Sequence, residues 1–356
     1  LKKKFQSQKF SKNLNMYNLV WSNLRINNDY LDHIKISNYI SLSLNTSFLN
    51  FNFIDKKINS IDCVSKNKKY TLISDFYILA CGGIENSRLL LWSKLKNKKL
   101  FNSELPIGKY YMHHPYHEVA SGIINYTKLK NYYYKNNHKH FPLITCDSTI
   151  YLEANDDFMS SNDIINSGMY INFKEVNVKN DLFKQLRCVA PEFIKNIYDD
   201  IKTKQTYEIS INTLQEQTPS KYNKITLGDR LDPIGMPLTK IFWKKLPSEK
   251  KSAIKILEEI GKLLLKDDIG RLAVEDYLYD ENSKYDVISG NHQMGGTRIG
   301  VSVTDSVVDK NLKVHGIENL YITGSSVFRT SGHCHPTYTI VQLSLRLAEH
   351  IISIKS

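Results

Sequence analysis

The C-terminal stretch 289–356 constrains the fold most strongly, because a strand, a small-residue loop and a long helix follow one another there. Residues 320–323 (LYIT) are typical of a short buried strand, which ends in Gly324-Ser325-Ser326. Pro336 and Thr337 open an apolar-periodic helix that extends to Ile352. Proline suits a first helical position, since its φ is already helical and it loses no hydrogen bond there. The sequence therefore predicts a helix whose N-terminus offers free N–H groups and a partial positive charge.

Two histidines, His292 and His335, stand on either side of this strand in the sequence. A neutral imidazole accepts protons near neutral pH, and the adjacent helix end favours negative charge. Proton abstraction by this pair is one interpretation, and a structural role for each histidine is the other. The run His333-Cys334-His335 has the composition of a metal site, but successive side chains of an extended segment point to opposite sides. We predict no metal site.

These elements, in this order, resemble the C-terminal signature of the glucose–methanol–choline (GMC) flavoprotein oxidoreductases, nearest their pyranose oxidase and sugar dehydrogenase branch. The family pattern is a His-x-x-Gly-Thr-type motif, a strand that ends in Gly-Ser-Ser, and Asn-Pro-Thr or His-Pro-Thr at a helix start. The matching segments here are 292–300 (HQMGGTRIG), 319–321 (NLY), 324–328 (GSSVF) and 335–337 (HPT).

The resemblance implies an FAD enzyme that oxidises a CH–OH group of a sugar or polyol, with the hydride passing to flavin N5. It assigns His292 as the catalytic base and His335 as the partner that holds the substrate oxygen. Backbone at Gly324 and Ser325 would approach the ribityl or pyrophosphate group. Pro336 and Thr337 at the helix N-terminus would stabilise negative charge on the reduced flavin.

A second element of the same kind lies near the N-terminal end. Residues 75–80 (DFYILA) predict a buried strand, which passes through Gly82-Gly83 into a helix over 84–92. Such a turn brings backbone close to a cofactor or to another chain segment, or it serves packing alone. The element resembles one of the family's FAD domain, which makes Gly82 a candidate for cofactor binding. By the same resemblance, the strand near Phe48 would contact the adenine.

Residues 106–286 alternate strand-like and helical patterns, including an amphipathic helix over 248–265. The stretch 216–243 resembles the family's substrate domain, and we expect a strand pair of the substrate sheet there. The predicted fold class is α/β (α+β): an FAD/NAD(P)-binding-type domain without its N-terminal βαβ unit, interleaved with a substrate domain built on an antiparallel sheet with helices. The predicted boundaries are 1–105 for part of the FAD-binding domain, 106–286 for the substrate domain, and 287–356 for the rest of the FAD-binding domain.

One family element is missing from the sequence. The family's FAD fold begins with G-x-G-x-x-G between a strand and a helix, and this chain contains no G-x-G. The chain also begins with Leu1 instead of Met. We therefore expect a fragment that needs an N-terminal FAD-binding segment as a partner, since the strand at 75–80 would otherwise have an open apolar edge. The alternative is an inactive remnant, or a non-catalytic chain that binds a carbohydrate or a partner without FAD.

The composition bears on the protein's partners, its cysteine chemistry and its location. The net charge is +12, but the basic residues are scattered in small runs, so we expect no nucleic-acid partner. The five cysteines form no CxxC motif, and no apolar run approaches the roughly 20 residues of a membrane span. No secretory signal opens the chain, so we expect a cytoplasmic protein without a membrane span. His113, His114 and His117 are expected to be hydrogen-bonded structural residues.

Overall fold

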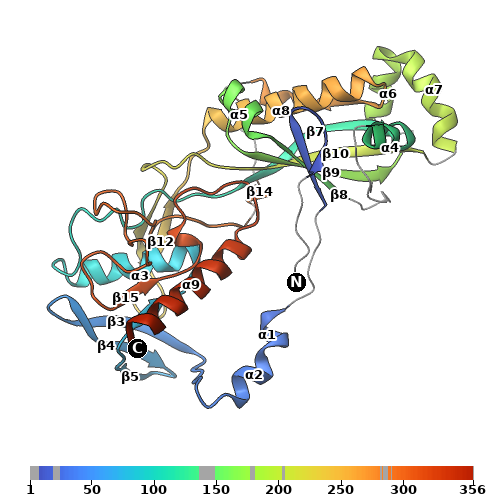
Figure 1. Ribbon diagram of the computed structural model, residues 1–356. Coiled ribbons are helices and arrows are strands. Elements are labelled where there is room, and N and C mark those ends of the chain that lie inside the picture. Colours follow the sequence, from blue (N-terminus) through green and yellow to red (C-terminus); the bar gives the residue numbers. More distant parts are fainter. Residues whose placement is uncertain are drawn as a thin grey trace.

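The structure is a computed structural model that describes residues 8–18, 25–135, 149–176, 181–202, 205–280, 283, 288–289 and 291–355. Its elements gather into two lobes, which Figure 1 shows at the upper right and the lower left. We call them the large-sheet lobe and the parallel-pair lobe. Each has its own apolar core, and the two largest buried clusters share no residue.

The large-sheet lobe is built on an eight-stranded antiparallel sheet. Seven strands follow the order β1-β2-β8-β9-β10-β7-β13, and β14 also pairs with β7. The strands are β1 (Gln8–Lys9), β2 (Leu14–Asn18), β7 (Pro115–Asn125), β8 (Thr149–Ala154), β9 (Ser167–Glu175), β10 (Thr206–Gln215), β13 (Gly270–Val274) and β14 (Ile288–Ser289).

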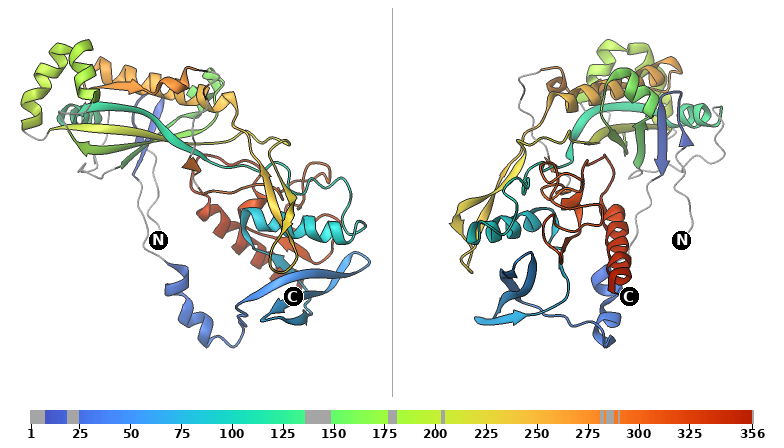
Figure 2. Two further views of the ribbon diagram at one scale, coloured as in Figure 1. Left: turned by 180° about the vertical axis from the view of Figure 1, so that it is seen from behind. Right: turned by 60° about the vertical axis from the view of Figure 1, so that its left-hand side comes forward.

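Helices cover this sheet because their apolar residues recur at helical spacing. In α8, for example, Ile256, Leu257, Ile260 and Leu264 are buried against strand residues such as Ile209. Figure 2 shows α8 and its neighbours on one side of the sheet. The helical elements of this lobe are α4 (Tyr126–Lys135), α5 (Asp156–Asn162), α6 (Asp181–Val189), α7 (Pro191–Lys202), α8 (Pro247–Lys266) and the 3₁₀ turn η1 (Asp276–Leu278).

The parallel-pair lobe is organised around β6 and β15, which pair in parallel with Tyr77 opposite Leu320 and Leu79 opposite Ile322. A three-stranded sheet β3-β4-β5 and a hairpin β11-β12 belong to the same lobe. Its elements are β3 (Thr46–Ile54), β4 (Lys57–Ser65), β5 (Lys68–Leu72), β6 (Tyr77–Leu79), α3 (Gly82–Lys96), β11 (Lys224–Leu231), β12 (Pro237–Phe242), β15 (Leu320–Ile322), the 3₁₀ turn η2 (Ser325–Val327) and α9 (Thr337–Lys355). Two short helices, α1 (Ile26–Asp29) and α2 (Leu31–Ile36), precede it.

The architecture confirms the predicted mixed α/β class with antiparallel sheets. One detail was wrong: the strand pair within 216–243 is not part of the large sheet. The hairpin β11-β12 forms a sheet of its own and packs against α3. An ion pair that the sequence pattern did not suggest links the hairpin to α3, since Arg88 of α3 binds Asp232 in the hairpin at 2.6 Å.

The predicted boundaries at 105 and 286 stay a prediction. The two lobes do interleave, because the parallel-pair core draws residues from both ends of the chain. Residues 8–18, which those boundaries place with the FAD-binding domain, lie in the large sheet. Leu14 and Met16 point into the large-sheet core there, and Met16 of β2 pairs with Leu152 of β8.

Apolar side chains are exposed on two elements of the parallel-pair lobe, α9 and β6. Among the residues of α9, only Leu347 is buried, while Val341, Leu345 and Ile352 are 42%, 55% and 68% exposed. Ile78, in the middle of β6, is 49% exposed, and no second strand pairs with β6 in the part of the chain that the structure describes. None of the described helices combines the length and hydropathy that a transmembrane segment requires.

Candidate active site

The parallel strands β6 and β15 end at the same edge of the sheet, and each is followed by a helical turn. Gly82 begins α3 with φ of 92°, and Gly324 precedes η2 with φ of 108°. A Cβ added at Gly82 would meet no atom within 4 Å, and one at Gly324 would meet only the Asn86 amide nitrogen, at 3.9 Å. Open space therefore lies in front of both backbones, where the carboxyl ends of parallel strands commonly bind ligands.

Gly83 differs from its neighbour Gly82. A Cβ at Gly83 would lie 2.2 Å from the Gln293 carbonyl oxygen, which no side chain tolerates. Gly83 thus admits another chain segment, as one of the two predicted uses requires, whereas the predicted cofactor contact at Gly82 stays a prediction. The close approach holds the segment that carries His292 against the start of α3.

Asn86 ties the two strand ends together, and sequence reasoning missed it. Its side chain is fully buried and accepts a hydrogen bond from the Cys81 N–H at 2.9 Å. It donates to the Thr323 carbonyl at 3.0 Å and to the Ser326 hydroxyl at 2.9 Å. Its neighbours Glu85, Ser87 and Arg88 are polar as well, so the sequence contained no signal that singled out Asn86.

The segment 293–297 lies beside η2 and is anchored there by Ser325 and Ser326. The Ser325 hydroxyl donates to the Gln293 carbonyl at 2.6 Å, and its own carbonyl accepts from the Gly295 N–H. The Thr297 N–H donates to the Ser326 carbonyl, and the Thr297 hydroxyl donates to the Ser326 hydroxyl. Ser325 therefore contacts this segment with its side chain, and these bonds fix where His292 lies.

The fold brings His292 and His335 together, although 43 positions separate them in the sequence. Nε2 of His292 lies 3.1 Å from Nδ1 of His335. On its other side, Nδ1 of His292 lies 2.9 Å from Nδ1 of His114. Nε2 of His335 lies 3.2 Å from the hydroxyl of Tyr170, which comes from β9. Three imidazoles and a phenol thus form one continuous chain of contacts, which we call the histidine chain.

All three imidazoles of the histidine chain are held neutral. Burial, with the neighbouring His292, lowers the pKa of His114 to about 3. Burial, with the neighbouring His335 and His113, lowers the pKa of His292 to about 4. Burial also lowers the pKa of His335. At neutral pH each ring therefore has one bare nitrogen that accepts a proton.

His114 was predicted to be a structural residue, and this was incomplete. It is completely buried, yet it contacts His292 directly. His117 fits the structural interpretation, with hydrogen bonds to Tyr277 and Gln215. The sequence offered no means of separating the two, since the difference lies in the distant partners that each residue contacts.

The neighbouring His333 is in a different state. Its Nε2 lies 2.7 Å from a carboxylate oxygen of Glu153, and its ring stacks on Tyr151. Burial opposes a charge there, but hydrogen bonds to Cys334 and Glu153 outweigh it and raise the pKa of His333 to about 9. The carboxylate also accepts a hydrogen bond from Tyr17. His333 is therefore a charged anchor for the segment that carries His335.

The remaining predicted residues lie at the helix N-terminus and in β3. Pro336 is buried, and its carbonyl accepts the first helical bond from the Ile340 N–H. The helix begins at Thr337, so Pro336 stands one position before the first helical residue rather than in it. Phe48 lies in β3 and packs on Phe51 with ring centroids 4.6 Å apart. Its predicted adenine contact stays a prediction.

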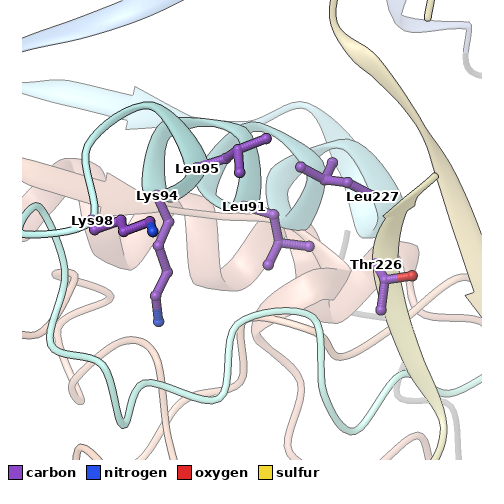
Figure 3. A pocket seen from close by; sticks show the side chains of 6 residues that line it. All are labelled: Leu91, Lys94, Leu95, Lys98, Thr226 and Leu227. Atoms are coloured by element: carbon purple, nitrogen blue, oxygen red, sulfur yellow. The ribbon is translucent and has the colours of Figure 1, made fainter. Parts of the chain in front are cut away.

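A separate groove of about 360 Å³ runs between α3 and β11. Figure 3 shows its lining, which consists of Leu91, Lys94, Leu95, Lys98, Thr226 and Leu227. It contains none of the predicted site residues. Within the described ranges, no three His, Cys, Asp or Glu side chains are arranged to hold a metal ion.

Comparisons with known proteins agree with this geometry. The family described as GMC oxidoreductase matches residues 219–344, the stretch that includes His292, Gly324 and the start of α9. The chain carries a GMC oxidoreductase domain. FAD is the cofactor of this family, and two solved structures of similar fold are described as an FAD-dependent oxidoreductase and a formate oxidase with modified FAD.

Three curated relatives are similar over parts of this chain. The fructose dehydrogenase large subunit of Gluconobacter japonicus is 28% identical over 45% of the chain and 28% of its own length. The pyranose 2-oxidase of Tricholoma matsutake is 39% identical over 17% of the chain and 11% of its own length. The 2-methyl-1,2-propanediol dehydrogenase of Mycolicibacterium austroafricanum is 24% identical over 80% of the chain and 49% of its own length.

Solved structures extend the likeness of fold to nearly the whole chain. The pyridoxine 4-oxidase of Mesorbium loti superposes with a TM-score of 0.57 at 12% identity, over 95% of this chain and 64% of that one. The FAD-dependent oxidoreductase of Chaetomium thermophilum gives 0.58 at 13% identity, over 92% and 64%. The chain thus spans less than two thirds of the length of these relatives.

Proposed function

We propose that this protein is an FAD-dependent oxidoreductase acting on a CH–OH group of a sugar or polyol, with His292 as the base. The observation that carries the proposal is the pair of neutral imidazoles, His292 and His335, with facing nitrogens 3.1 Å apart. The names of the relatives, a fructose dehydrogenase, a pyranose 2-oxidase and a propanediol dehydrogenase, support the sugar or polyol class.

The residues present fit FAD on two observations. Gly82 and Gly324 leave open space at the ends of two parallel strands, where backbone can approach a phosphate or ribityl group. The N-terminus of α9, which begins at Thr337 after Pro336, offers the N–H groups of its first turn and a partial positive charge to an electron-rich ring. Bound FAD would supply the hydride acceptor for the reaction.

The chain's own residues would handle the proton and the substrate oxygen. A substrate hydroxyl placed between the two rings replaces their mutual hydrogen bond. It donates its proton to the bare nitrogen of His292, and its oxygen accepts a hydrogen bond from His335. Because the pKa of His292 is lowered to about 4, the base is unprotonated at neutral pH without assistance. Tyr170 orients His335 from the other side.

The proposed function also requires a further polypeptide segment on the surface formed by β6 and α9. In the part of the chain that the structure describes, the parallel-pair lobe provides two parallel strands, an edge of β6 without a partner strand, and exposed apolar residues on α9. We propose that a nucleotide-binding βαβ segment with G-x-G-x-x-G covers this face, whether joined to the chain or separate. Its strand would pair with β6 and remove the open edge. A cytoplasmic location and the absence of a nucleic-acid partner stay predictions.

A visible absorption spectrum tests the proposal. The protein is purified with FAD, alone and with a G-x-G-x-x-G segment of a GMC relative co-expressed, and sugars and polyols are then added. We expect flavin bands in the co-expressed sample that a sugar or polyol bleaches. His33→Ala, at an exposed position in α2, is the matched control for His292→Ala, which should abolish bleaching.

The alternative is an inactive remnant, or a non-catalytic chain that binds a carbohydrate or a partner. The open edge of β6 is the observation that favours it. Absence of flavin from every sample would support this alternative against the proposal. Flavin retained without bleaching by any sugar or polyol would contradict the substrate class.

A further inference from the structure

His114 is connected to the backbone in a way that determines where its proton lies. Its Nε2 lies 3.3 Å from the Ser331 carbonyl oxygen. A carbonyl only accepts, so Nε2 of His114 carries the hydrogen. His114 is neutral in its fully buried position, and its Nδ1 is therefore bare.

The proton positions of the next two rings follow from this one. Nδ1 of His292 lies 2.9 Å from the bare Nδ1 of His114, so the hydrogen between them belongs to His292. Neutral His292 then has a bare Nε2. That atom lies 3.1 Å from Nδ1 of His335, which accordingly carries its hydrogen, and Nε2 of His335 accepts from the Tyr170 hydroxyl. One backbone carbonyl thus sets every tautomer in the histidine chain.

Ser331, which supplies this carbonyl, is bound through its side chain to Gln217. The Gln217 N–H donates to the Ser331 hydroxyl at 2.9 Å, and its side-chain oxygen accepts from the His113 N–H at 3.1 Å. The buried Gln217 therefore holds Ser331 and the residue before His114. The same amide oxygen accepts from the Trp243 indole at 2.7 Å, which fixes its orientation.

We propose that His114 is a positioning residue that keeps His292 in the Nδ1–H tautomer, so that the bare Nε2 faces His335 and the substrate hydroxyl. The catalytic consequence rests on the proposed function, whereas the tautomer does not depend on it. Without an acceptor at His114, the Nδ1–H of His292 would lose its partner, and His292 would shift toward the Nε2–H tautomer. The nitrogen beside His335 would then carry a hydrogen and could not take a proton.

Nitrogen-15 NMR of the imidazoles tests this without FAD or substrate. Long-range proton–nitrogen spectra of the labelled protein distinguish a bare ring nitrogen from a protonated one, and His292→Ala assigns the signals. We expect Nδ1–H and a bare Nε2 on His292 in the wild type. His114→Phe should shift His292 toward the Nε2–H tautomer, and His114→Asn, whose side-chain oxygen replaces the Nδ1 acceptor, should restore it. His117→Phe, at a nearby buried histidine, is the matched control and should leave the tautomer of His292 unchanged.

Two results would overturn the proposal: an Nε2–H tautomer on His292 in the wild type, or an unchanged tautomer in folded His114→Phe. If His114→Phe does not fold, the wild-type spectrum decides alone. In the flavin-loaded enzyme, we expect kcat/KM to fall about 10- to 100-fold in His114→Phe, with at least part of it recovered in His114→Asn. Correct tautomers in a protein that oxidises no sugar or polyol would refute the proposed function and leave the role of His114 in setting the tautomer standing.

Discussion

His333 and His335 stand two positions apart on one segment, and the fold gives them opposite charge states. His333 faces the Glu153 carboxylate, and its pKa rises to about 9. His335 faces another imidazole and a phenol, and burial lowers its pKa. Both rings are partly or largely removed from water, so burial does not explain the difference. The partner does: a carboxylate stabilises the charged ring, and a neutral ring does not.

The difference separates anchoring from chemistry. A charged His333 bound to Glu153 ties the segment 331–335 to strands β2 and β8 of the large sheet. A neutral pair His292–His335 keeps a bare nitrogen for a proton. Had the two environments been exchanged, a protonated ring would stand where the proposed reaction needs a base.

The largest expected effect is on activity, when the base is removed. In the flavin-loaded enzyme, His292→Ala should lower kcat/KM about 10²- to 10⁴-fold, since that is the usual contribution of a positioned acid or base. Steady-state kinetics with the best sugar or polyol measures it, with His33→Ala as the control. A loss below about tenfold would show that another group takes the proton.

The second largest effect is expected on stability, when the charged His333 loses its carboxylate partner. Glu153→Gln leaves His333 without its carboxylate, and the ring gives up its proton instead of remaining charged and unpaired. We expect the free energy of unfolding to fall by about 1–3 kcal/mol near pH 7, as for a lost hydrogen bond to a charged group. Urea unfolding measures it, with exposed Glu104→Gln as the matched control. A stability equal to that of the wild type would mean that the pair does not hold the segment.

The pH dependence of stability should have opposite signs at the two sites. His114 is neutral in the folded state down to about pH 3, whereas the unfolded chain binds its proton near the ordinary pKa of about 6.5. Stability is therefore lost as the pH falls below about 6.5. His333 keeps its proton to about pH 9, so stability is lost as the pH rises from about 6.5 to about 9.

Urea unfolding from pH 4.5 to pH 9 compares the wild type with two variants. His114→Phe should flatten the acidic side alone, and His333→Phe the alkaline side alone. If the free energy of unfolding changed equally steeply with pH on the acidic and the alkaline side in either variant, the assigned charge states would be contradicted.

The smallest effects concern the two hydroxyls that end the networks. Tyr170→Phe removes the donor to His335, and Tyr17→Phe removes a donor to Glu153. We expect Tyr170→Phe to lower kcat/KM a few-fold while stability changes by about 1 kcal/mol. Tyr17→Phe should leave kcat/KM nearly unchanged and lower the pKa of His333, measured by NMR titration. The reverse pattern would mean that the anchor and the reactive pair are not separate.

The sequence by itself predicted the elements with strong local signals. The strand before Gly324, the helix after Pro336 and the amphipathic helix α8 follow from periodicity and from the conformations of proline and glycine. The ordered motifs around His292 and His335 also identified the family that the comparisons support. These features depend on neighbours within a few residues, which is why they can be read from one chain.

Only the tertiary structure decided which distant side chains meet. His114 contacts His292 across 178 positions, and Asn86 links the ends of both parallel strands. Arg88 of α3 binds the β11-β12 hairpin, which is not part of the large sheet. The sequence treated His114 and His117 alike, because a histidine has the same composition whichever partner it faces. Partner and burial set the charge and tautomer of an imidazole, and both are fixed by long-range packing that a local pattern does not contain.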